Sequence, residues 1–267
     1  MGKKILVPIV ALIAVCVLCI GCQKKSQGLT IRSGTLTIGM EVGYPPMEYY
    51  SDDGKTLIGF DIDLGKAIAA KMGLKVKFID TDWDGIFNGV NEKKYDCIMS
   101  SVTVNPQRLA VYNFSKPYIS NTLALVLLKN SKRTIRTPLE CGGLTVAYQL
   151  ETTSEAYMEE LAADGMEYTP HRYDKIGQCF EDLKSGVVDV VASDLLVAYD
   201  YIAPENSPFE IVWTNPEDEK FGVCMKKGDD ALTEAVNKAL DELFGDGTML
   251  FISRKIFGMD LVTAARR

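Results

Sequence analysis

The sequence predicts an α/β protein made of two successive units, each with its own sheet. Short β-branched runs alternate with helical patterns from Thr35 onward, and a second series of the same kind starts at Leu123. The chain has 267 residues, of which 47% are hydrophobic and 24% charged, so it is long enough for two modest cores. Because open α/β sheets bind ligands beyond the carboxyl ends of their strands, we expect a binding cleft between the two units.

Charge and residue counts exclude several classes of function. The formal net charge is −7, which disfavours nucleic acid as a partner. The single histidine, His171, leaves little room for histidine-based metal or acid–base chemistry, so we expect neither a metal nor a cofactor. Seven cysteines are too few and too irregularly spaced for a disulfide scaffold.

Residues 1–21 have the architecture of a signal peptide. Two lysines precede an apolar run over residues 5–20, which is shorter than the roughly 20 residues needed to span a bilayer and disfavours a permanent transmembrane helix. A glycine and then Cys22 follow the run and resemble a bacterial lipobox, although Cys19 stands where leucine is usual. We therefore expect Cys22 to be lipidated as the mature N-terminus, with residues 22–34 as a flexible tether.

The first unit is predicted to contain three strands and two helices. Its first helix has apolar side chains mostly at helical spacing, with Asp61 as the N-cap and Gly73 as the stop. Strands are expected over residues 35–40, 75–79 and 96–99, and helices over residues 61–72 and 84–91.

The second unit is predicted to contain five strands and three helices. Thr152 and Glu155 have the spacing of a capping box, which starts one helix directly after a strand. The chain then forms a strand over residues 221–225 and closes with two helices, the first with an apolar stripe over residues 231–244. The strands of the second unit are expected over residues 123–128, 145–148, 167–171, 187–192 and 209–212, and its helices after Thr152, Asp174 and Asp194.

Polar and aromatic candidate residues lie just after these predicted strands. Asn105 and Pro106 are predicted to start a helix, and Arg108 falls in its first turn. A cation at this positive end of the helix dipole is slightly unfavourable, and an anionic ligand would reverse this small electrostatic penalty. Taken singly, such side chains are more often surface residues, helix caps or core aromatics. The candidates are Tyr44, Trp83, Ser100, Ser101, Thr103, Arg108, Thr152, Thr153 and Asp194.

Two opposite charges in this set suggest the ligand. Arg108 can hold a carboxylate by two parallel hydrogen bonds, and the hydroxyls of Ser101 and Thr103 and the N–H groups near Thr153 add donors. Asp194 supplies an acceptor for an ammonium group. Opposite charges held at a fixed separation suit a zwitterionic α-amino acid.

The segments that contain these residues resemble the amino-acid-binding family of extracellular solute-binding proteins that serve ABC importers. The similarity extends from about residue 36 to residue 258. Its most specific part is the segment 100–118, in which the arginine of the family, here Arg108, binds the ligand carboxylate. Further similar segments are residues 43–48, 59–64, 82–86, 146–155 and 188–194.

The resemblance implies a two-lobed periplasmic-binding-protein-like type II fold, with two mixed sheets flanked by helices. Two hinge strands would join the lobes, near residues 120–125 and 215–221. Lobe 1 would comprise residues 35–119 and 217–267, and lobe 2 residues 120–216. A ligand that bridges the lobes would then favour the closed state.

The resemblance also implies roles for single residues. The aromatic rings of Tyr44 and Trp83 would pack on the ligand. Thr153 would contribute a backbone or hydroxyl contact, and Asp194 would bind the ligand ammonium.

Two acids bear on the side chain of the ligand. The family usually has glycine at the position of Glu151, so this carboxylate either points to solvent or faces a cationic ligand. Glu41 occupies a position where relatives for basic amino acids have an acid, and residues 82–85 are also closer to those members. Together these features favour arginine, lysine or a related cation over glutamate.

The implied function is that of a non-enzymatic, extracytoplasmic lipoprotein that binds a free L-amino acid. Its lipid anchor would hold it at the cell membrane, facing the periplasm or the cell exterior, where it would deliver the amino acid to a separate ABC permease and ATPase. One alternative is an anchored sensor or adhesin that keeps the pocket. Another is a cyclohexadienyl dehydratase-like enzyme that uses Glu41 or Glu151 as a general acid. Neighbouring permease and ATPase genes would favour transport.

The pairing of the cysteines stays open. Cys97 and Cys224 lie in predicted strands of one lobe, and Cys141 and Cys179 lie in the other lobe. In each lobe the two cysteines are either free thiols or a disulfide pair.

Overall fold

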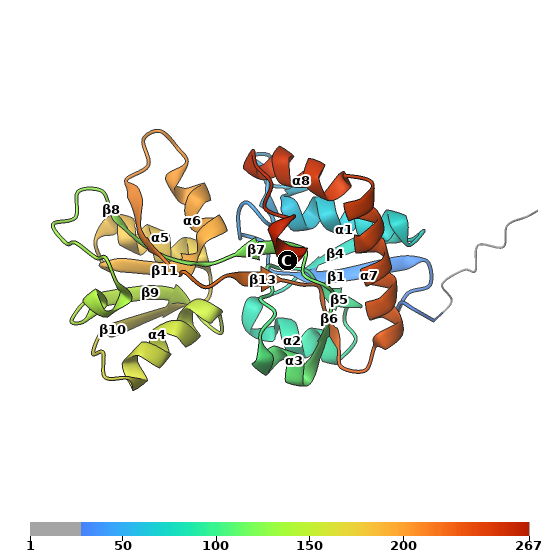
Figure 1. Cartoon of the computed structure of the whole chain (residues 1–267), viewed down its shortest axis with the longest axis horizontal. Helices are drawn as coiled ribbons and strands as arrows, with labels where there is room; N and C mark the ends of the chain where they lie inside the picture. Colours follow the sequence, from blue (N-terminus) through green and yellow to red (C-terminus); the bar gives the residue numbers. More distant parts are fainter. Residues whose placement is uncertain (1–27, 267) are drawn as a thin grey trace, which may run out of the picture.

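The computed structural model describes residues 28–266 and has two lobes, each built on an open five-stranded sheet with helices against it (Figure 1). In the first lobe the strand order is β4-β1-β5-β14-β6, and β14 runs antiparallel to its two neighbours. This mixed sheet agrees with the predicted fold class. Its strands are β1 (Thr35–Met40), β4 (Lys75–Asp80), β5 (Cys97–Ile98), β6 (Tyr112–Phe114) and β14 (Cys224–Lys226).

The first helix of this lobe begins one residue earlier than predicted. Its N-cap is Gly59, not Asp61, because a Cβ on Gly59 would lie 2.1 Å from the carbonyl oxygen of Met47 and φ there is +128°. Asp61 is instead buried in the first turn. The helices of the first lobe are α1 (Phe60–Lys71), α2 (Trp83–Asn91), α3 (Pro106–Val111), α7 (Asp230–Gly245) and α8 (Thr248–Phe257).

The second lobe repeats the mixed arrangement with the strand order β10-β9-β11-β8-β12. Strand β8 is antiparallel to both β11 and β12, whereas β10, β9 and β11 are parallel. Its strands are β8 (Leu123–Leu128), β9 (Thr145–Gln149), β10 (Thr169–Tyr173), β11 (Val190–Asp194) and β12 (Phe209–Thr214), and its helices are α4 (Thr153–Ala163), α5 (Ile176–Ser185) and α6 (Leu195–Ile202).

Two short strands connect the lobes. β7 (Ile119–Asn121) and β13 (Glu219–Phe221) form an antiparallel pair in which Asn121 lies opposite Glu219 (Figure 1). The single strand predicted over residues 221–225 is wrong, because the chain leaves β13 at Gly222 and resumes as β14. A Cβ on Gly222 would lie 2.8 Å from the Val104 side chain, so the backbone passes close to lobe 1 there.

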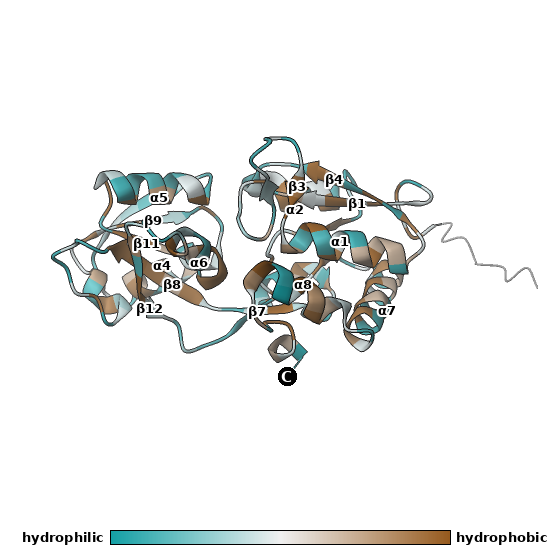
Figure 2. Ribbon diagram, turned by 90° about the horizontal axis from the view of Figure 1, so that it is seen from above, coloured by the Kyte–Doolittle hydropathy of each residue, from teal (hydrophilic) through white to brown (hydrophobic). Residues whose placement is uncertain are grey.

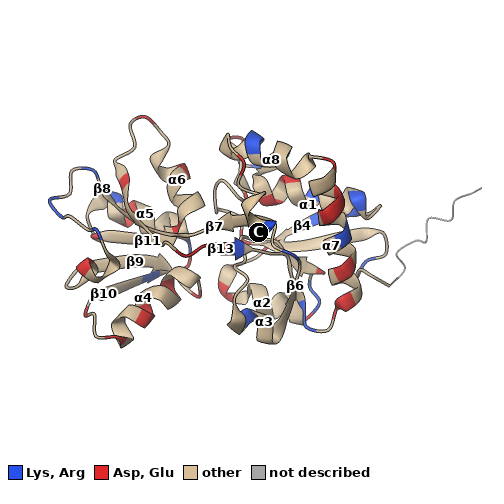
Figure 3. Cartoon of the chain, viewed as in Figure 1, with Lys and Arg blue, Asp and Glu red and all other residues tan. Residues whose placement is uncertain are grey.

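The central strands carry the two cores. All but one residue of β1 and of β8 are buried, and β8 is apolar throughout, as expected for strands covered on both faces. Figure 2 shows β8 in brown, whereas α5 is largely hydrophilic on its outer side. Charged residues of both signs occur along the chain in both lobes (Figure 3).

Smaller elements complete the described chain. A hairpin of β2 and β3 follows the loop after β1, and within residues 28–266 no helix is long and apolar enough to cross a membrane. The expected signal peptide and Cys22 lie outside the described residues. The remaining elements are β2 (Tyr49–Tyr50), β3 (Leu57–Ile58) and the 3-10 helices η1 (Pro138–Cys141) and η2 (Ala264–Arg266).

The cysteines of residues 28–266 are buried free thiols. Cys97 and Cys224 lie in the paired strands β5 and β14 and still form no disulfide. Burial raises the pKa of the thiols of Cys141 and Cys224 to about 12. Of the two possibilities that the sequence left open, the structure therefore supports thiols.

Candidate functional site

A cavity lies between the lobes, where β1 and β5 of the first lobe and β9 and β11 of the second end. Ten of the eleven residues that the sequence singled out line this cavity, and Glu151 does not. Gln149 also lines it. The complete lining is Glu41, Tyr44, Trp83, Ser100, Ser101, Thr103, Arg108, Gln149, Thr152, Thr153 and Asp194.

Asp194 ends β11, and two side chains donate hydrogen bonds to its carboxylate. The Tyr44 hydroxyl donates to Oδ2 at 2.5 Å, and Asn121 Nδ2 donates to Oδ1 at 2.7 Å. Burial and then the charge of Glu219 raise the pKa of Asp194 to about 7, while the two hydrogen bonds and Arg108 act in the opposite direction. An ammonium group beside Asp194 would favour the ionised carboxylate.

Arg108 lies in the first turn of α3, where Asn105 Oδ1 accepts a 2.8 Å hydrogen bond from its backbone N–H. Its Nη1 donates to the carbonyl of Thr103 at 3.1 Å, and its Nη2 donates to the carbonyl of Glu151 at 3.3 Å. The guanidinium also lies 5.7 Å from the centroid of the Trp83 ring. Its hydrogen-bond partners within residues 28–266 are neutral backbone carbonyls, so the positive charge of Arg108 is available to pair with an anionic ligand.

Two buried polar atoms in the cavity wall have no hydrogen-bond partner in the described part of the chain. They are Ser101 Oγ and Trp83 Nε1. A buried group without a partner costs about 1–3 kcal/mol, so polar atoms of a ligand would be stabilised here. Ser100 differs, because its hydroxyl donates to Glu48 at 2.6 Å and accepts from the Glu41 N–H at 3.0 Å. Ser100 therefore supports the wall from behind.

Helix α4 begins at the cavity with Thr152 as its N-cap. The Thr152 hydroxyl accepts from the Glu155 N–H at 3.3 Å, as the predicted capping box requires. The Glu155 carboxylate, however, accepts from the Glu151 N–H at 2.6 Å and so reaches one residue further back than in a capping box. Thr153 is the first helical residue, at the end of the helix that favours an anion.

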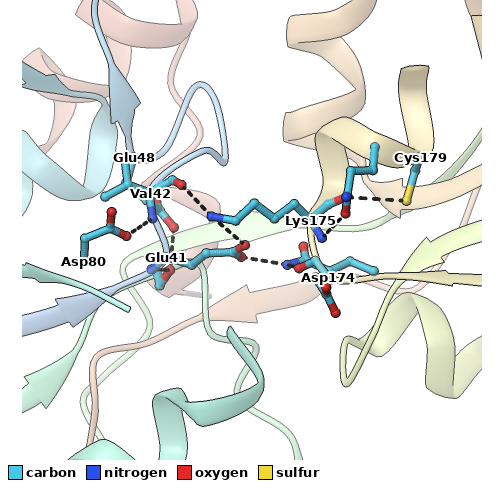
Figure 4. Close-up of polar contacts among 10 residues, drawn as sticks. Glu41, Val42, Glu48, Asp80, Asp174, Lys175 and Cys179 are labelled. Carbon is cyan, nitrogen blue, oxygen red and sulfur yellow. Dashed lines mark hydrogen bonds and ion pairs between the residues drawn. The ribbon is translucent and has the colours of Figure 1, made fainter. Parts of the chain in front are cut away.

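Glu41 lies in the cavity wall and is contacted from the opposite lobe (Figure 4). Gln149 Nε2 donates to its Oε2 at 2.7 Å, and Lys175 Nζ lies 3.9 Å from its Oε1 and 3.4 Å from the carbonyl oxygen of Val42. Burial raises the pKa of Glu41 to about 7, although Gln149 and Lys175 both lower it. A buried acid of lobe 1 is thus paired with two side chains of lobe 2.

The side chain of Glu151 is exposed, and its backbone has φ of +57°. This left-handed conformation is strained for a residue with a side chain and accounts for glycine at this position in the similar family. Only the carbonyl of Glu151 takes part in the site, as an acceptor for Arg108. The arrangement matches the solvent-facing alternative for its carboxylate.

The family of the chain follows from a comparison with known proteins. Residues 36–259 match the model for bacterial extracellular solute-binding proteins, family 3. The chain belongs to this family.

Individual relatives and structures are similar over most of this solute-binding protein. The L-cystine-binding protein TcyJ of Escherichia coli (strain K12) is 31% identical over 228 residues, which cover 85% of this chain and 84% of TcyJ. An ancestral arginine-binding protein bound to arginine has a TM-score of 0.80 and 37% identity, covering 84% of this chain and 99% of that one. The ancestral amino acid-binding protein AncCDT-1, a precursor of cyclohexadienyl dehydratase, has a TM-score of 0.76 and 31% identity, covering 84% and 96%.

Sequence reasoning missed four polar residues of this solute-binding protein. Gln149 and Lys175 contact Glu41, and the hinge residues Asn121 and Glu219 contact Asp194 and the threonines. Gln149 is the last residue of a strand. Position at the end of a strand identified the other site residues in the sequence and could have identified Gln149 as well. Nothing local distinguishes the other three.

Proposed function

We propose that the protein binds a free α-amino acid between its lobes, with the carboxylate on Arg108 and the ammonium group on Asp194. The observation that carries this proposal is that Arg108 of the first lobe and Asp194 of the second line one cavity. Ser101 and Thr153 would add donors to the carboxylate. Because the two charges belong to different lobes, a zwitterion would stabilise the closed arrangement through contacts that neither lobe makes alone.

A basic amino acid is the side-chain class that we propose first. The buried carboxylate of Glu41 would pair with a cationic group, and the rings of Tyr44 and Trp83 would hold it by cation–π attraction worth about 0.5–2 kcal/mol. The arginine-binding structural neighbour supports this class. Lys175 is 44% exposed at its side chain, so a ligand cation could replace it beside Glu41.

A side chain that ends in a second zwitterion is the other candidate, and a neighbouring cavity favours it. This cavity shares Trp83 with the first and is lined by three aspartates and by Lys175. The aspartates would accept from a distal ammonium group, and Lys175 would pair with a distal carboxylate. The cystine bound by the relative TcyJ has such an end.

We further propose that the protein is lipid-anchored at Cys22 outside the cytoplasmic membrane and delivers its ligand to an ABC permease and ATPase. The family membership and the names of the relatives support delivery rather than the sensor or adhesin alternative. The likeness to AncCDT-1 keeps the dehydratase alternative relevant, but AncCDT-1 is itself described as an amino acid-binding protein.

A thermal-shift screen tests the binding proposal, because a ligand that binds only the folded state raises the apparent stability. The panel contains arginine, lysine, ornithine, histidine, cystine, glutamine and glutamate. The largest shift with a basic amino acid supports the first side-chain class, and the largest shift with cystine supports the second. A largest shift with glutamate or glutamine overturns both side-chain classes and leaves amino-acid binding intact. No shift with any amino acid refutes the binding proposal. Native mass spectrometry of protein purified without added ligand identifies what the cavity retains.

A further inference from the structure

Glu219, on the hinge strand β13, connects the two lobes through hydroxyl groups. Its Oε2 accepts from the Thr103 hydroxyl of lobe 1 at 3.3 Å and from the Thr153 hydroxyl of lobe 2 at 3.1 Å. Asn121 Nδ2, on the paired hinge strand β7, lies 3.5 Å from the same oxygen. One carboxylate oxygen on the hinge therefore contacts both walls of the cleft.

The same two threonines line the cavity beside Arg108, where the ligand carboxylate is proposed to bind. A threonine hydroxyl has one proton to donate. While Glu219 is ionised it receives both protons, so the hydroxyls present only lone pairs to a second carboxylate, which the charge of Glu219 also repels. A protonated Glu219 can instead donate to one hydroxyl, and both hydroxyl protons become free for the ligand.

Glu219 also interacts with the acid expected to bind the ligand ammonium. Asn121 Nδ2 donates to Asp194 Oδ1 at 2.7 Å and lies 3.5 Å from Glu219, so a single amide contacts both carboxylates. Burial raises the pKa of Glu219, whereas the two threonines, Arg108 and Asn121 lower it. The charge of Glu219 in turn raises the pKa of Asp194. The other titratable and charged groups that interact with the pair are Arg108, Tyr44 and Glu48.

We propose that the amino acid binds when the pair of Asp194 and Glu219 holds one proton, and that the bound ligand places this proton on Glu219. The ligand ammonium favours an ionised Asp194, and the ligand carboxylate favours a neutral Glu219. The pair thus adopts the charge distribution that complements a zwitterion. Glu219 is a positioning residue, because it controls how Thr103 and Thr153 direct their protons. This inference rests on the proposed binding of the zwitterion by Arg108 and Asp194.

Calorimetric titrations with L-glutamine and with L-arginine between pH 5.5 and 8.5 test the inference. The wild-type affinity should pass through a maximum, because the pair loses its single-proton form on either side. The alkaline decline should approach about tenfold for each pH unit once both acids are ionised. L-Glutamine has no side-chain charge and separates this effect from the titration of Glu41.

The Glu219→Gln variant has a permanently neutral side chain and should keep its affinity on the alkaline side. Only the acid decline should remain, and it should move to lower pH because the charge of Glu219 no longer raises the pKa of Asp194. The matched control is Glu217→Gln, since Glu217 is exposed two positions earlier in the chain. This control should keep the wild-type maximum.

The dependence of the binding enthalpy on the buffer provides a second readout. At pH 8 the wild type should take up close to one proton more than Glu219→Gln when ligand binds. Equal pH profiles for the two proteins, or wild-type uptake below about half a proton, would overturn the inference while leaving amino-acid binding intact. The proton uptake of the wild type tests the inference by itself, even if the Glu219→Gln variant does not fold. If the wild type binds no amino acid, the proposed function itself fails.

Discussion

Tyr44 and Asp194 lie 150 positions apart in the chain, and the Tyr44 hydroxyl donates a 2.5 Å hydrogen bond to the Asp194 carboxylate across the cleft. Tyr44 belongs to the loop after β1, whereas Asp194 ends β11. The bond lowers the pKa of Asp194 against the effect of burial. A residue expected only to pack its ring on the ligand therefore also stabilises the ionised form of the ammonium-binding acid.

The Tyr44→Phe variant should separate these two roles, because phenylalanine keeps the ring and removes the donor. We expect amino-acid affinity to fall by about 1–2 kcal/mol at pH 7. The loss should be larger at pH 6 than at pH 8, since a raised pKa leaves more of Asp194 protonated at the lower pH. Calorimetry at the three pH values measures this, and an affinity equal to that of the wild type at all three would assign Tyr44 to packing alone.

Arg108→Ala and Asp194→Ala should each weaken amino-acid binding by roughly 2–5 kcal/mol, the scale for truncating one partner of a buried charge pair. Both variants should remain folded by circular dichroism. Arg133 and Asp189 form an ion pair outside the cavity, with Arg133 side chain 46% exposed, so Arg133→Ala is the matched control and should bind normally. Near-native affinity of either cavity variant would contradict the proposed zwitterion site.

The two-lobed fold and much of the site wall could be predicted, because the signals are local. Asp194 and Ser100 each follow or end a recognisable β run. Two predictions that depend on tertiary contacts were wrong. The start of α1 is set by the close approach of Gly59 to Met47, and Gly222 interrupts a β-branched run that resembles a single strand. The lobe boundaries at residues 120 and 217 stay a prediction.

The hinge acid could not be predicted, because its partners are remote. Glu219 lies in a strand of three residues, and its contacts Thr103 and Thr153 are 116 and 66 positions away. The same holds for Lys175, which reaches the carbonyl of Val42 from 133 positions away. A charged residue such as Glu219 or Lys175 resembles a surface residue in the sequence. It becomes part of the site only through contacts that form when the two lobes meet.

The Glu41→Gln and Glu151→Gln variants should differ in their effect on selectivity. Glu41 lines the cavity, so its neutral variant should lose affinity for arginine or lysine and keep whatever weak binding the protein has for neutral amino acids. Glu151 is exposed, so the same change there should leave the ranking of ligands intact. A thermal-shift comparison of the three proteins checks this, and a loss confined to Glu151→Gln would reverse the assignment.

Cys22→Ser should release the protein from the membrane, because the lipid that we expect on Cys22 would be its anchor. Cys19→Ser changes a neighbouring cysteine in the same way and should leave the protein bound. Fractionation of cells with and without detergent compares the two variants. Membrane retention of Cys22→Ser equal to that of the wild type would reject lipidation at this residue.

Two buried acids behind the site should make the stability of the protein depend on pH. Glu48 accepts from Ser100 at 2.6 Å, and Asp61 accepts from the Ser101 N–H at 2.9 Å and from the Tyr118 hydroxyl at 3.0 Å. Both acids are 0% exposed. Burial raises the pKa of Asp61 to about 7, and burial and the charge of Asp61 raise the pKa of Glu48 further above its usual range.

Because both pKa values are raised in the folded state, the stability that these acids contribute is present below the unfolded pKa values, near 4. The contribution of Asp61 is lost as the pH rises through about 7, and that of Glu48 is lost as the pH rises through its own raised pKa. Glu48→Gln removes one titration and supplies an amide that can accept from Ser100 and donate to Asp61. Its melting temperature should therefore exceed that of the wild type at pH 8.5, with a difference that shrinks toward pH 5. Glu234→Gln, an exposed change of the same kind on α7, should parallel the wild type at every pH. If Glu48→Gln also runs parallel to the wild type, Glu48 does not lose its proton between pH 5 and 8.5, and the predicted gain in stability at pH 8.5 is refuted.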